Sequence, residues 1–384
     1  MTQEPTSETS LDRHLQEMLD RNASDLFLRA DSPPSLRVNG ELLRTQLPAP
    51  TQEDMRRYLD RMLTPVARQR FEESPDLDIA YTMNRKARFR VNIFMHQGRL
   101  GIAARAIPLG SIEFDNLNLP EEIRAMADRQ AGLVLVVGPT GCGKSTTLAS
   151  LVHHVNKVRR AHIVTIEDPI EFVHDEDKAL IHQRQVGFDT ESFATALRHV
   201  VRQSPDVILI GEMRDTDTMQ TALSAALTGH LIFSTLHTTN VVQSIDRILN
   251  YFPPEARGQA QADLASTLIG IVSMRLLPTA DGDGRVPAVE VLIGTPTIKR
   301  LIKEGNSVEI YDVMKRSRDV GMRTLNQSLV DLVEQEKVTQ EQALPYAPNP
   351  DEFRLNLQGM YTGIESIDLR TQLQADDEED GDEK

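Results

Sequence analysis

Apolar residues near the start of the chain recur at helical spacing, and short alternating segments separate the helical stretches. Residues 25–28 and 35–38 have strand patterns, and Asn39-Gly40 predicts a hairpin turn before a third strand at 41–43. Two stretches place their apolar residues on one helical face, namely Leu11, Leu15, Met18 and Leu19, then Met55, Leu59, Met62 and Leu63. The first part of the chain is therefore predicted to mix helices with strands.

A second hairpin is predicted around Gln97-Gly98. Residues 88–94 alternate between apolar and polar side chains, as expected for a strand with one buried face. If Gln97-Gly98 is a two-residue turn, Arg90 lies directly opposite Arg105. Like charges in that arrangement repel, so the pair needs an anion or an acidic neighbour nearby. The alternative is that both arginines are simply solvated on an exposed sheet face.

The pattern changes to strand–helix alternation from Pro120, which is typical of an α/β domain with a mainly parallel sheet. After about Gly282 short amphipathic helices predominate, and one is expected from Met322 to Val333. We therefore divide the chain into an N-terminal domain (11–108), a linker (109–118), an α/β domain with C-terminal helices (119–374) and an acidic, disordered tail (375–384).

The charge, the apolar runs and the cysteine count of the chain disfavour several classes of protein. The 384 residues carry 42 Lys and Arg against 57 Asp and Glu, a net charge of −15. Seven acids and one lysine lie in the last ten residues, and the remainder is still acidic. Binding to nucleic acid is therefore not expected, since such proteins are usually basic. No apolar run approaches the ~20 residues of a membrane-spanning helix, and no signal sequence is recognised. One cysteine excludes an intramolecular disulfide, and a cytoplasmic location is expected.

The strongest motif is a G-x-x-x-x-G-K-S phosphate loop. An apolar strand at 133–137 precedes it and a helix-like run follows from Lys144, which is the context that phosphate binding needs. Lys144 is expected to reach the β- and γ-phosphates of ATP, and Ser145 to bind Mg²⁺. Cys142 is interpreted as a filler. The predicted nucleotide-binding residues are Gly138, Pro139, Thr140, Gly141, Cys142, Gly143, Lys144, Ser145 and Thr146.

Two further strands end in acidic residues. The run 162–166 leads into Glu167-Asp168-Pro169-Ile170-Glu171, and the run 207–210 leads into Gly211-Glu212. Acids at this edge of a parallel sheet can act on water or metal, although a helix cap or a solvated loop is an equally common role. Glu212 is expected to contact Mg²⁺ through water, because glycine occupies the position where a Walker B aspartate usually stands. His230 and His237 flank another apolar strand, and sensing of the γ-phosphate is one role open to them.

Together these motifs resemble the type IV pilus retraction ATPases of the PilT/PilU family, within the secretion ATPase superfamily. The resemblance covers about residues 11–357 and rests on long motifs, among them RFRVNIF, GPTGCGKSTTL, HIVTIEDPIEFVH, SPDVILIGEMRD, TGHLIFSTLHTTN and GRVPAVEVLIGTP. It implies a PAS-like N-terminal α+β domain followed by a RecA-like ATPase domain, assembled as a hexameric ring.

The resemblance also implies roles for individual residues. Glu171 corresponds to the general base of the family, and Glu212 to its second catalytic carboxylate. His230 and His237 correspond to histidines that sense nucleotide. Arg90 and Arg105 map onto the arginine fingers, so ATP would be the anion that this pair requires.

The implied function is an ATP-driven motor that powers or assists pilus retraction, at the cytoplasmic side of the inner membrane. The C-terminal half is more similar to PilU, and Thr297-Ile-Lys-Arg-Leu301 replaces the AIRNL-type motif of PilT-like proteins. Expected partners are further copies of the chain, an inner-membrane platform protein and a PilT-like ATPase. The alternatives are an accessory nucleotide-binding subunit that depends on a partner motor, and a nucleic-acid translocase, which the acidic composition disfavours.

Overall fold

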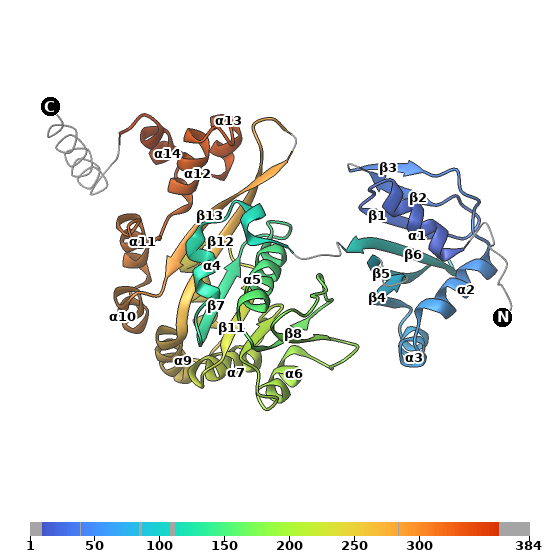
Figure 1. Cartoon of the computed structure of the whole chain (residues 1–384), viewed down its shortest axis with the longest axis horizontal. Helices are drawn as coiled ribbons and strands as arrows, with labels where there is room; N and C mark the ends of the chain where they lie inside the picture. Colours follow the sequence, from blue (N-terminus) through green and yellow to red (C-terminus); the bar gives the residue numbers. More distant parts are fainter. Residues whose placement is uncertain (1–9, 39, 84–86, 108–111, 283, 361–384) are drawn as a thin grey trace. The chain divides into compact units, whose positions relative to one another are not determined.

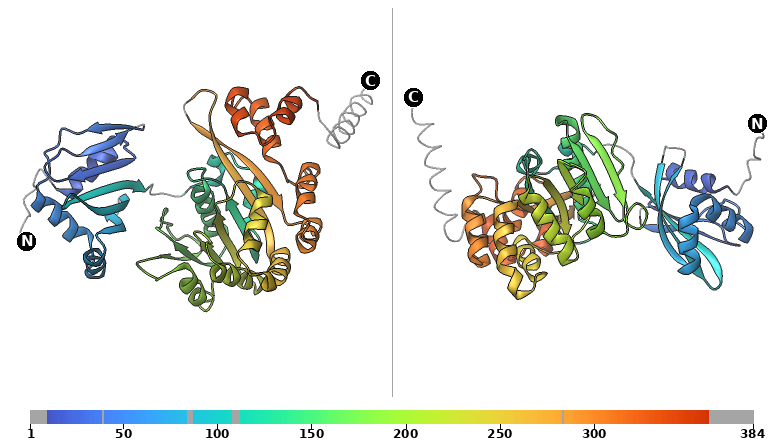
Figure 2. Two further views of the ribbon diagram at one scale, coloured as in Figure 1. Left: turned by 180° about the vertical axis from the view of Figure 1, so that it is seen from behind. Right: turned by 90° about the horizontal axis from the view of Figure 1, so that it is seen from below.

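The computed structural model describes residues 10–38, 40–83, 87–107, 112–282 and 284–360. These residues form two compact units, one within 1–110 together with 168–173, the other within 111–167 and 174–384. Each unit is built on its own β-sheet (Figures 1 and 2). Asn39 of the first predicted turn, residues 109–111 of the predicted linker and the acidic tail lie outside the described residues.

The N-terminal unit is a six-stranded antiparallel sheet in the order β3-β2-β1-β6-β5-β4. Apolar side chains of three helices pack on one face of it and close the core. The predicted hairpin is present, because Gln97 and Gly98 both have positive φ and Arg90 pairs with Arg105. The elements are α1 (Leu11–Asp20), β1 (Asp25–Arg29), β2 (Ser35–Val38), β3 (Glu41–Arg44), α2 (Gln52–Met62), α3 (Pro65–Glu73), β4 (Asp76–Met83), β5 (Ala87–His96) and β6 (Arg99–Ile107).

The second unit is a seven-stranded sheet in the order β13-β12-β7-β11-β10-β8-β9. All neighbouring strands run parallel except β13, which is antiparallel to β12. The parallel strands are buried on both faces, which explains their continuous apolar runs. The strands are β7 (Gly132–Val137), β8 (His162–Glu167), β9 (Leu180–Gln185), β10 (Val207–Ile210), β11 (Leu231–Leu236), β12 (Leu268–Pro278) and β13 (Arg285–Ile293).

Helices cover both faces of this sheet. One face packs against α4 (Glu121–Ala127) and α5 (Lys144–Val158). The other packs against α6 to α11, and a separate cluster joins the far ends of β12 and β13 to α12, α13 and α14. The remaining bounds are α6 (Phe193–Val200), α7 (Thr216–Leu227), α8 (Val241–Asn250), α9 (Pro254–Thr267), α10 (Pro296–Glu304), α11 (Ser307–Arg316), α12 (Leu325–Glu334), α13 (Gln340–Ala343), η2 (Leu344–Tyr346) and α14 (Pro350–Leu357).

The region after Gly282 differs from the expectation of mostly helices. Residues 285–293 form β13, a strand buried along most of its length, before the helices begin at Pro296. Buried strands on a sheet covered on both sides lack the alternation that identifies a strand from sequence. The helix predicted from Met322 begins at Leu325, with Thr324 as its N-cap, and Met322 is buried just before it.

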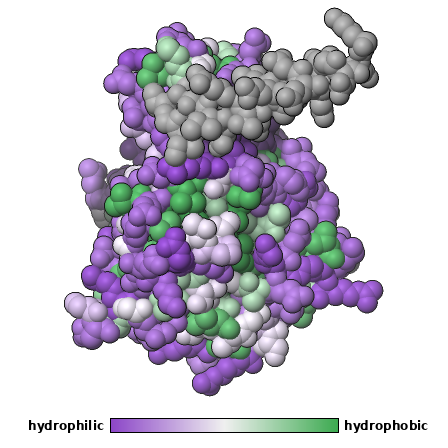
Figure 3. Space-filling model, turned by 90° about the vertical axis from the view of Figure 1, so that its left-hand side faces the viewer, coloured by the Kyte–Doolittle hydropathy of each residue, from purple (hydrophilic) through white to green (hydrophobic). Residues whose placement is uncertain are grey.

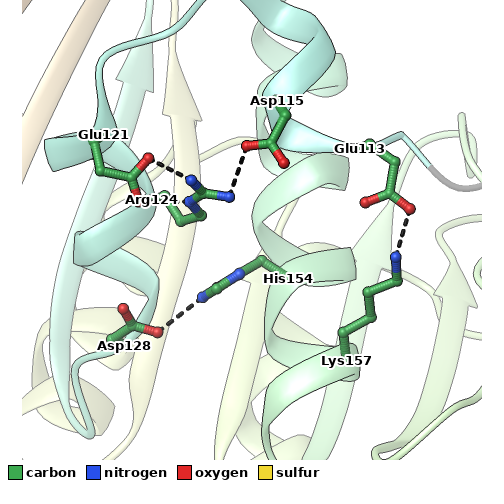
Figure 4. Close-up of polar contacts among 7 residues, drawn as sticks. All are labelled: Glu113, Asp115, Glu121, Arg124, Asp128, His154 and Lys157. Atoms are coloured by element: carbon green, nitrogen blue, oxygen red, sulfur yellow. Dashed lines mark hydrogen bonds and ion pairs between the residues drawn. The ribbon is translucent and has the colours of Figure 1, made fainter.

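Polar contacts fasten the first residues of the second unit to α5 (Figure 4). Glu113 accepts a hydrogen bond from Lys157 at 2.5 Å, and Asp128 contacts His154 at 2.8 Å. Residues 114–117, in the segment expected to be linker, form a short 3-10 helix, η1 (Phe114–Leu117), with Phe114 buried. These contacts fix the helix that follows the phosphate loop.

The surface of the second unit is mixed in character. Figure 3 shows hydrophobic side chains scattered among hydrophilic ones on the face it presents. Across the described ranges, no helix combines the length and the apolar character needed to cross a membrane.

Candidate nucleotide-binding site

The phosphate loop connects β7 directly to α5. Gly138 has φ 142°, and a Cβ there would meet the Cys142 Sγ and the Met274 carbonyl oxygen at 2.7 Å. Gly143 has φ 100° and precedes the first residue of α5. Glycine at these two positions allows the backbone to turn tightly so that its N–H groups and the helix N-terminus can face an anion.

Lys144 is buried at the centre of this loop. Its ammonium donates hydrogen bonds to the carbonyl oxygens of Gly138 and Pro139, both at 3.0 Å. Both acceptors are neutral, and among the described residues no carboxylate forms an ion pair with Lys144. A buried, unneutralised ammonium is a strong binding group for phosphate.

The neighbouring loop residues fit the same arrangement. Ser145 and Thr146 occupy the first turn of α5 and are half-buried, whereas Pro139 and Thr140 are exposed. Burial raises the pKa of the Cys142 thiol, so the residue stays a neutral thiol packed in the core, which agrees with its interpretation as a filler.

The parallel order of the strands brings three predicted groups to one edge of the sheet. β11 lies between β7 and β10, with Leu236 paired to Val137 and Ser234 paired to Ile210. His237 therefore follows β11 at the level of the phosphate loop, and Glu212 follows β10 two strands away, about 10 Å from the β7 axis. Ligands of open α/β sheets bind at this edge.

Glu212 and His237 contact each other there. The His237 Nε2 lies 3.4 Å from the Glu212 Oε2, and the other carboxylate oxygen forms an ion pair with Arg214. The Glu212 side chain is 11% exposed, whereas those of His237 and Arg214 are 54% and 70% exposed. A shielded carboxylate held between two exposed basic groups can orient water or a metal-bound water.

His230 does not join this group. It precedes β11, and its carbonyl accepts the N–H of Gly132, the first residue of β7. The whole length of β11 separates it from His237, about 20 Å at the usual rise of a strand. Its Nδ1 contacts the Ala225 carbonyl at 2.9 Å, a cap at the end of α7. His230 is thus distant from the phosphate loop of its own chain, and its role in sensing nucleotide stays a prediction.

Glu171 lies four residues beyond the end of β8. It is exposed, in the segment 168–173 that groups with the N-terminal unit. Its role as general base stays a prediction.

Arg90 and Arg105 lie in a row of paired residues that crosses four strands of the N-terminal sheet. The row runs Arg37, Asp25, Arg105 and Arg90. Asp25 accepts a hydrogen bond from Arg105 at 2.8 Å, and Asp78 lies 3.6 Å from Arg90. The acidic neighbours that the opposed arginines require are thus present. The two arginine side chains remain 44% and 66% exposed and available to a further anion.

Sequence reasoning missed two arginines near the phosphate-loop edge. Arg214 pairs with Glu212 and stands only two residues after it, so the GEMR sequence offered a signal. Arg275 extends from β12 on the other side of β7 and donates to the carbonyls of Met274 and Thr239, at 2.8 and 2.7 Å. Ser273 pairs with Val137, the last residue of β7, and Arg275 follows two residues later. Only the register of β12 against β7 shows that Arg275 lies at this edge.

Comparison with known proteins identifies the family. The family model described as type II/IV secretion system protein matches residues 2–344. The chain belongs to this family. Two relatives from Pseudomonas aeruginosa are the type IV pilus ATPase PilU, 39% identical over 89% of each chain, and the type IV pilus retraction ATPase PilT, 40% identical over 87% of this chain and 96% of PilT. The predicted membership of the PilT/PilU group of ATPases is confirmed, but these identities do not separate its two branches.

A solved structure supports the same assignment. The crystal structure of the pilus retraction motor PilT with bound ADP matches with a TM-score of 0.84 at 39% identity, covering 89% of this chain and 98% of that one. The predicted fold class, an N-terminal α+β domain followed by a RecA-like ATPase domain, is confirmed.

Proposed function

We propose that this member of the secretion ATPase family is an ATP-hydrolysing motor of the type IV pilus machinery that powers or assists pilus retraction. The observation that carries the proposal is the buried Lys144 in a complete phosphate loop, at the same sheet edge as the Glu212–His237 pair. The motor would act as a homo-hexameric ring at the cytoplasmic face of the inner membrane, against a platform protein and alongside a PilT-like ATPase.

The chain's own residues account for binding and hydrolysis. Lys144 and the loop N–H groups would hold the β- and γ-phosphates of ATP. Glu171 is the proposed general base for the attacking water, and Glu212 would orient that water and the metal's hydration shell. His237, held against Glu212, would report whether the γ-phosphate is present. Binding and release of ATP would then shift the ring between closed and open arrangements.

Mg²⁺ fits the donor atoms at this edge. The Ser145 hydroxyl and the Glu212 carboxylate are hard oxygen ligands, which Mg²⁺ prefers, and it commonly keeps several waters while binding phosphate oxygens. Among the described residues, no group of three or more His, Cys, Asp or Glu side chains could hold a metal. When bound, Mg²⁺ would neutralise charge on the transferred phosphoryl group.

A second candidate is an accessory subunit that binds nucleotide but depends on a partner motor. The observation favouring it is the sequence Thr297-Ile-Lys-Arg-Leu301 in α10, where PilT-like chains carry an AIRNL-type motif. The two functions differ in steady-state hydrolysis of Mg-ATP by the purified full chain at ring-forming concentration. We expect turnover without a partner. Tight ATP binding without turnover would instead support the accessory role, and absence of both would contradict the ATPase proposal itself.

We expect Arg105→Ala or Arg90→Ala rings to lose at least about 100-fold in kcat, because an arginine finger stabilises charge that develops on the γ-phosphate. If each finger serves a neighbouring subunit, mixing Arg105→Ala with Glu212→Gln chains restores part of the lost turnover. A mixed interface then combines an intact arginine with an intact Glu212. The measurement is phosphate release against the ratio of the two variants.

Arg99→Ala provides the matched control, since Arg99 begins the same strand and pairs with the exposed Asp31 at 3.0 Å. It should retain wild-type turnover. If the mixture releases phosphate no faster than the sum of the two variants measured alone, a finger acting between subunits is contradicted.

A further inference from the structure

Glu290 is a lone acidic residue in the otherwise apolar part of β13, and it is only 3% exposed. Its Oε2 accepts a hydrogen bond from the Val241 N–H at 3.0 Å. Val241 is the first residue of α8, so this N–H has no partner within the helix. A carboxylate at a helix N-terminus is also favoured by the helix dipole. Glu290 therefore fixes the point at which α8 begins.

The same strands hold the residues that lead into α8. The Thr239 carbonyl accepts hydrogen bonds from the Ser273 hydroxyl at 3.2 Å and from Arg275 at 2.7 Å. Ser273 lies directly opposite Glu290 in the pairing of β12 with β13. The four-residue connection 237–240 is thus held at one end by β12 and β13. At its other end His237 meets Glu212.

A purely architectural role does not account for an acid at this position. The Asn240 side chain already caps α8 by accepting the Gln243 N–H at 2.8 Å, so the helix has an ordinary N-cap. A neutral acceptor could take the Val241 N–H without the cost of burying a charge. Its hydrogen bond would be weaker, however, because a bond to an ionised acceptor is about twice as strong as one between neutral groups. Burial raises the pKa of the Glu290 carboxyl from 4.5 to about 7, and the Val241 N–H and Arg275 oppose that rise.

We propose that Glu290 is a positioning residue for His237: through Val241 it sets the 237–240 connection so that His237 meets Glu212. The proposal rests on the proposed ATPase function, since Glu212 and His237 act there. The groups that face the carboxylate are Arg275 from β12 and the backbone amide of α8. The adjacent residue of β13, Val289, donates its backbone N–H to the Ser328 hydroxyl of α12.

Glu290→Gln tests this role because it keeps the shape and an acceptor oxygen but removes the charge. At pH 8 we expect kcat for ATP to fall about tenfold, with KM within twofold of wild type. Wild-type kcat should decline as the pH falls through about 7, where Glu290 becomes protonated. The variant should lack that acidic limb, since its side chain is neutral throughout. Ser328→Ala, which removes a contact to the adjacent residue, should keep both the rate and the limb.

Hydrogen exchange of the full-length chain gives a readout independent of hydrolysis. Backbone amides in 237–245 should exchange faster in Glu290→Gln than in wild type or Ser328→Ala, with β7 and β10 unchanged. If the wild type hydrolyses no ATP, the ATPase proposal fails, while the exchange result still tests Glu290. A Glu290→Gln variant with the kcat and the exchange rates of the wild type would overturn the inference. Faster exchange over the whole sheet, together with a lower kcat and a raised KM, would also overturn it, because that result indicates general damage to the fold.

Ser273→Ala supplies a milder variant should Glu290→Gln fail to fold. It removes one of the two donors to Thr239 and should lower kcat two- to threefold with KM unchanged. Unaltered kcat and unaltered exchange at 237–245 in Ser273→Ala would then count against the inference.

Discussion

Lys144→Ala is expected to abolish measurable binding of ATP by the full-length chain. The ammonium is buried in the loop and donates only to two neutral carbonyls, so phosphate oxygens are far stronger acceptors for it. A hydrogen bond to a charged group contributes about 1.5–3 kcal/mol, and Lys144 would contact two phosphates. The loss is then about 3 kcal/mol or more, which raises Kd at least about 100-fold. Titration with a fluorescent ATP analogue measures it.

Lys157→Ala is the matched control for Lys144. It removes the same charge from the opposite end of α5, where Lys157 is 44% exposed and pairs with Glu113. Its Kd for ATP should stay within about twofold of wild type, because an exposed ion pair contributes at most about 1 kcal/mol to stability. An unchanged Kd in Lys144→Ala, with normal unfolding, would overturn the assignment of the phosphate loop.

Local rules were sufficient for the parts of the site that are continuous in sequence. The phosphate loop needs only glycines at fixed places between a strand and a helix, and the structure has that context. The Gln97-Gly98 turn likewise determines the register that opposes Arg90 to Arg105. In both cases a turn of known geometry specifies where the flanking side chains go.

Residues that meet through the order of the strands could not be found in this way. Arg275 and Glu290 reach the His237 connection because β12 lies beside β7 and β13 beside β12, and no motif states that order. His230 and His237 show the same limit. Both flank one apolar run in the sequence, yet a strand of six residues places its two ends at opposite edges of the sheet.

Glu212→Gln is expected to preserve ATP binding while lowering kcat by about 1,000-fold or more. The carboxylate is shielded from solvent and lies at the edge where the water would attack, and its two oxygens contact His237 and Arg214. The amide keeps the shape but carries no negative charge with which to orient the attacking water or to pair with Arg214. Groups that act on the attacking water contribute about 100- to 10,000-fold. Single-turnover hydrolysis and ATP titration of the same preparation separate the two effects.

Two further variants, measured in the same way as Glu212→Gln, separate a specific role of this carboxylate from the loss of any acidic side chain. Glu304→Gln neutralises an exposed glutamate that pairs with Arg300 at 2.8 Å, and it should retain both binding and turnover. Glu171→Gln should also bind ATP and fail to hydrolyse it if Glu171 is the general base. If both Glu171→Gln and Glu212→Gln bind ATP and neither hydrolyses it, both carboxylates act in the chemical step. Wild-type turnover in Glu212→Gln would remove this carboxylate from the mechanism, and hydrolysis would then require an acid from another segment of the chain.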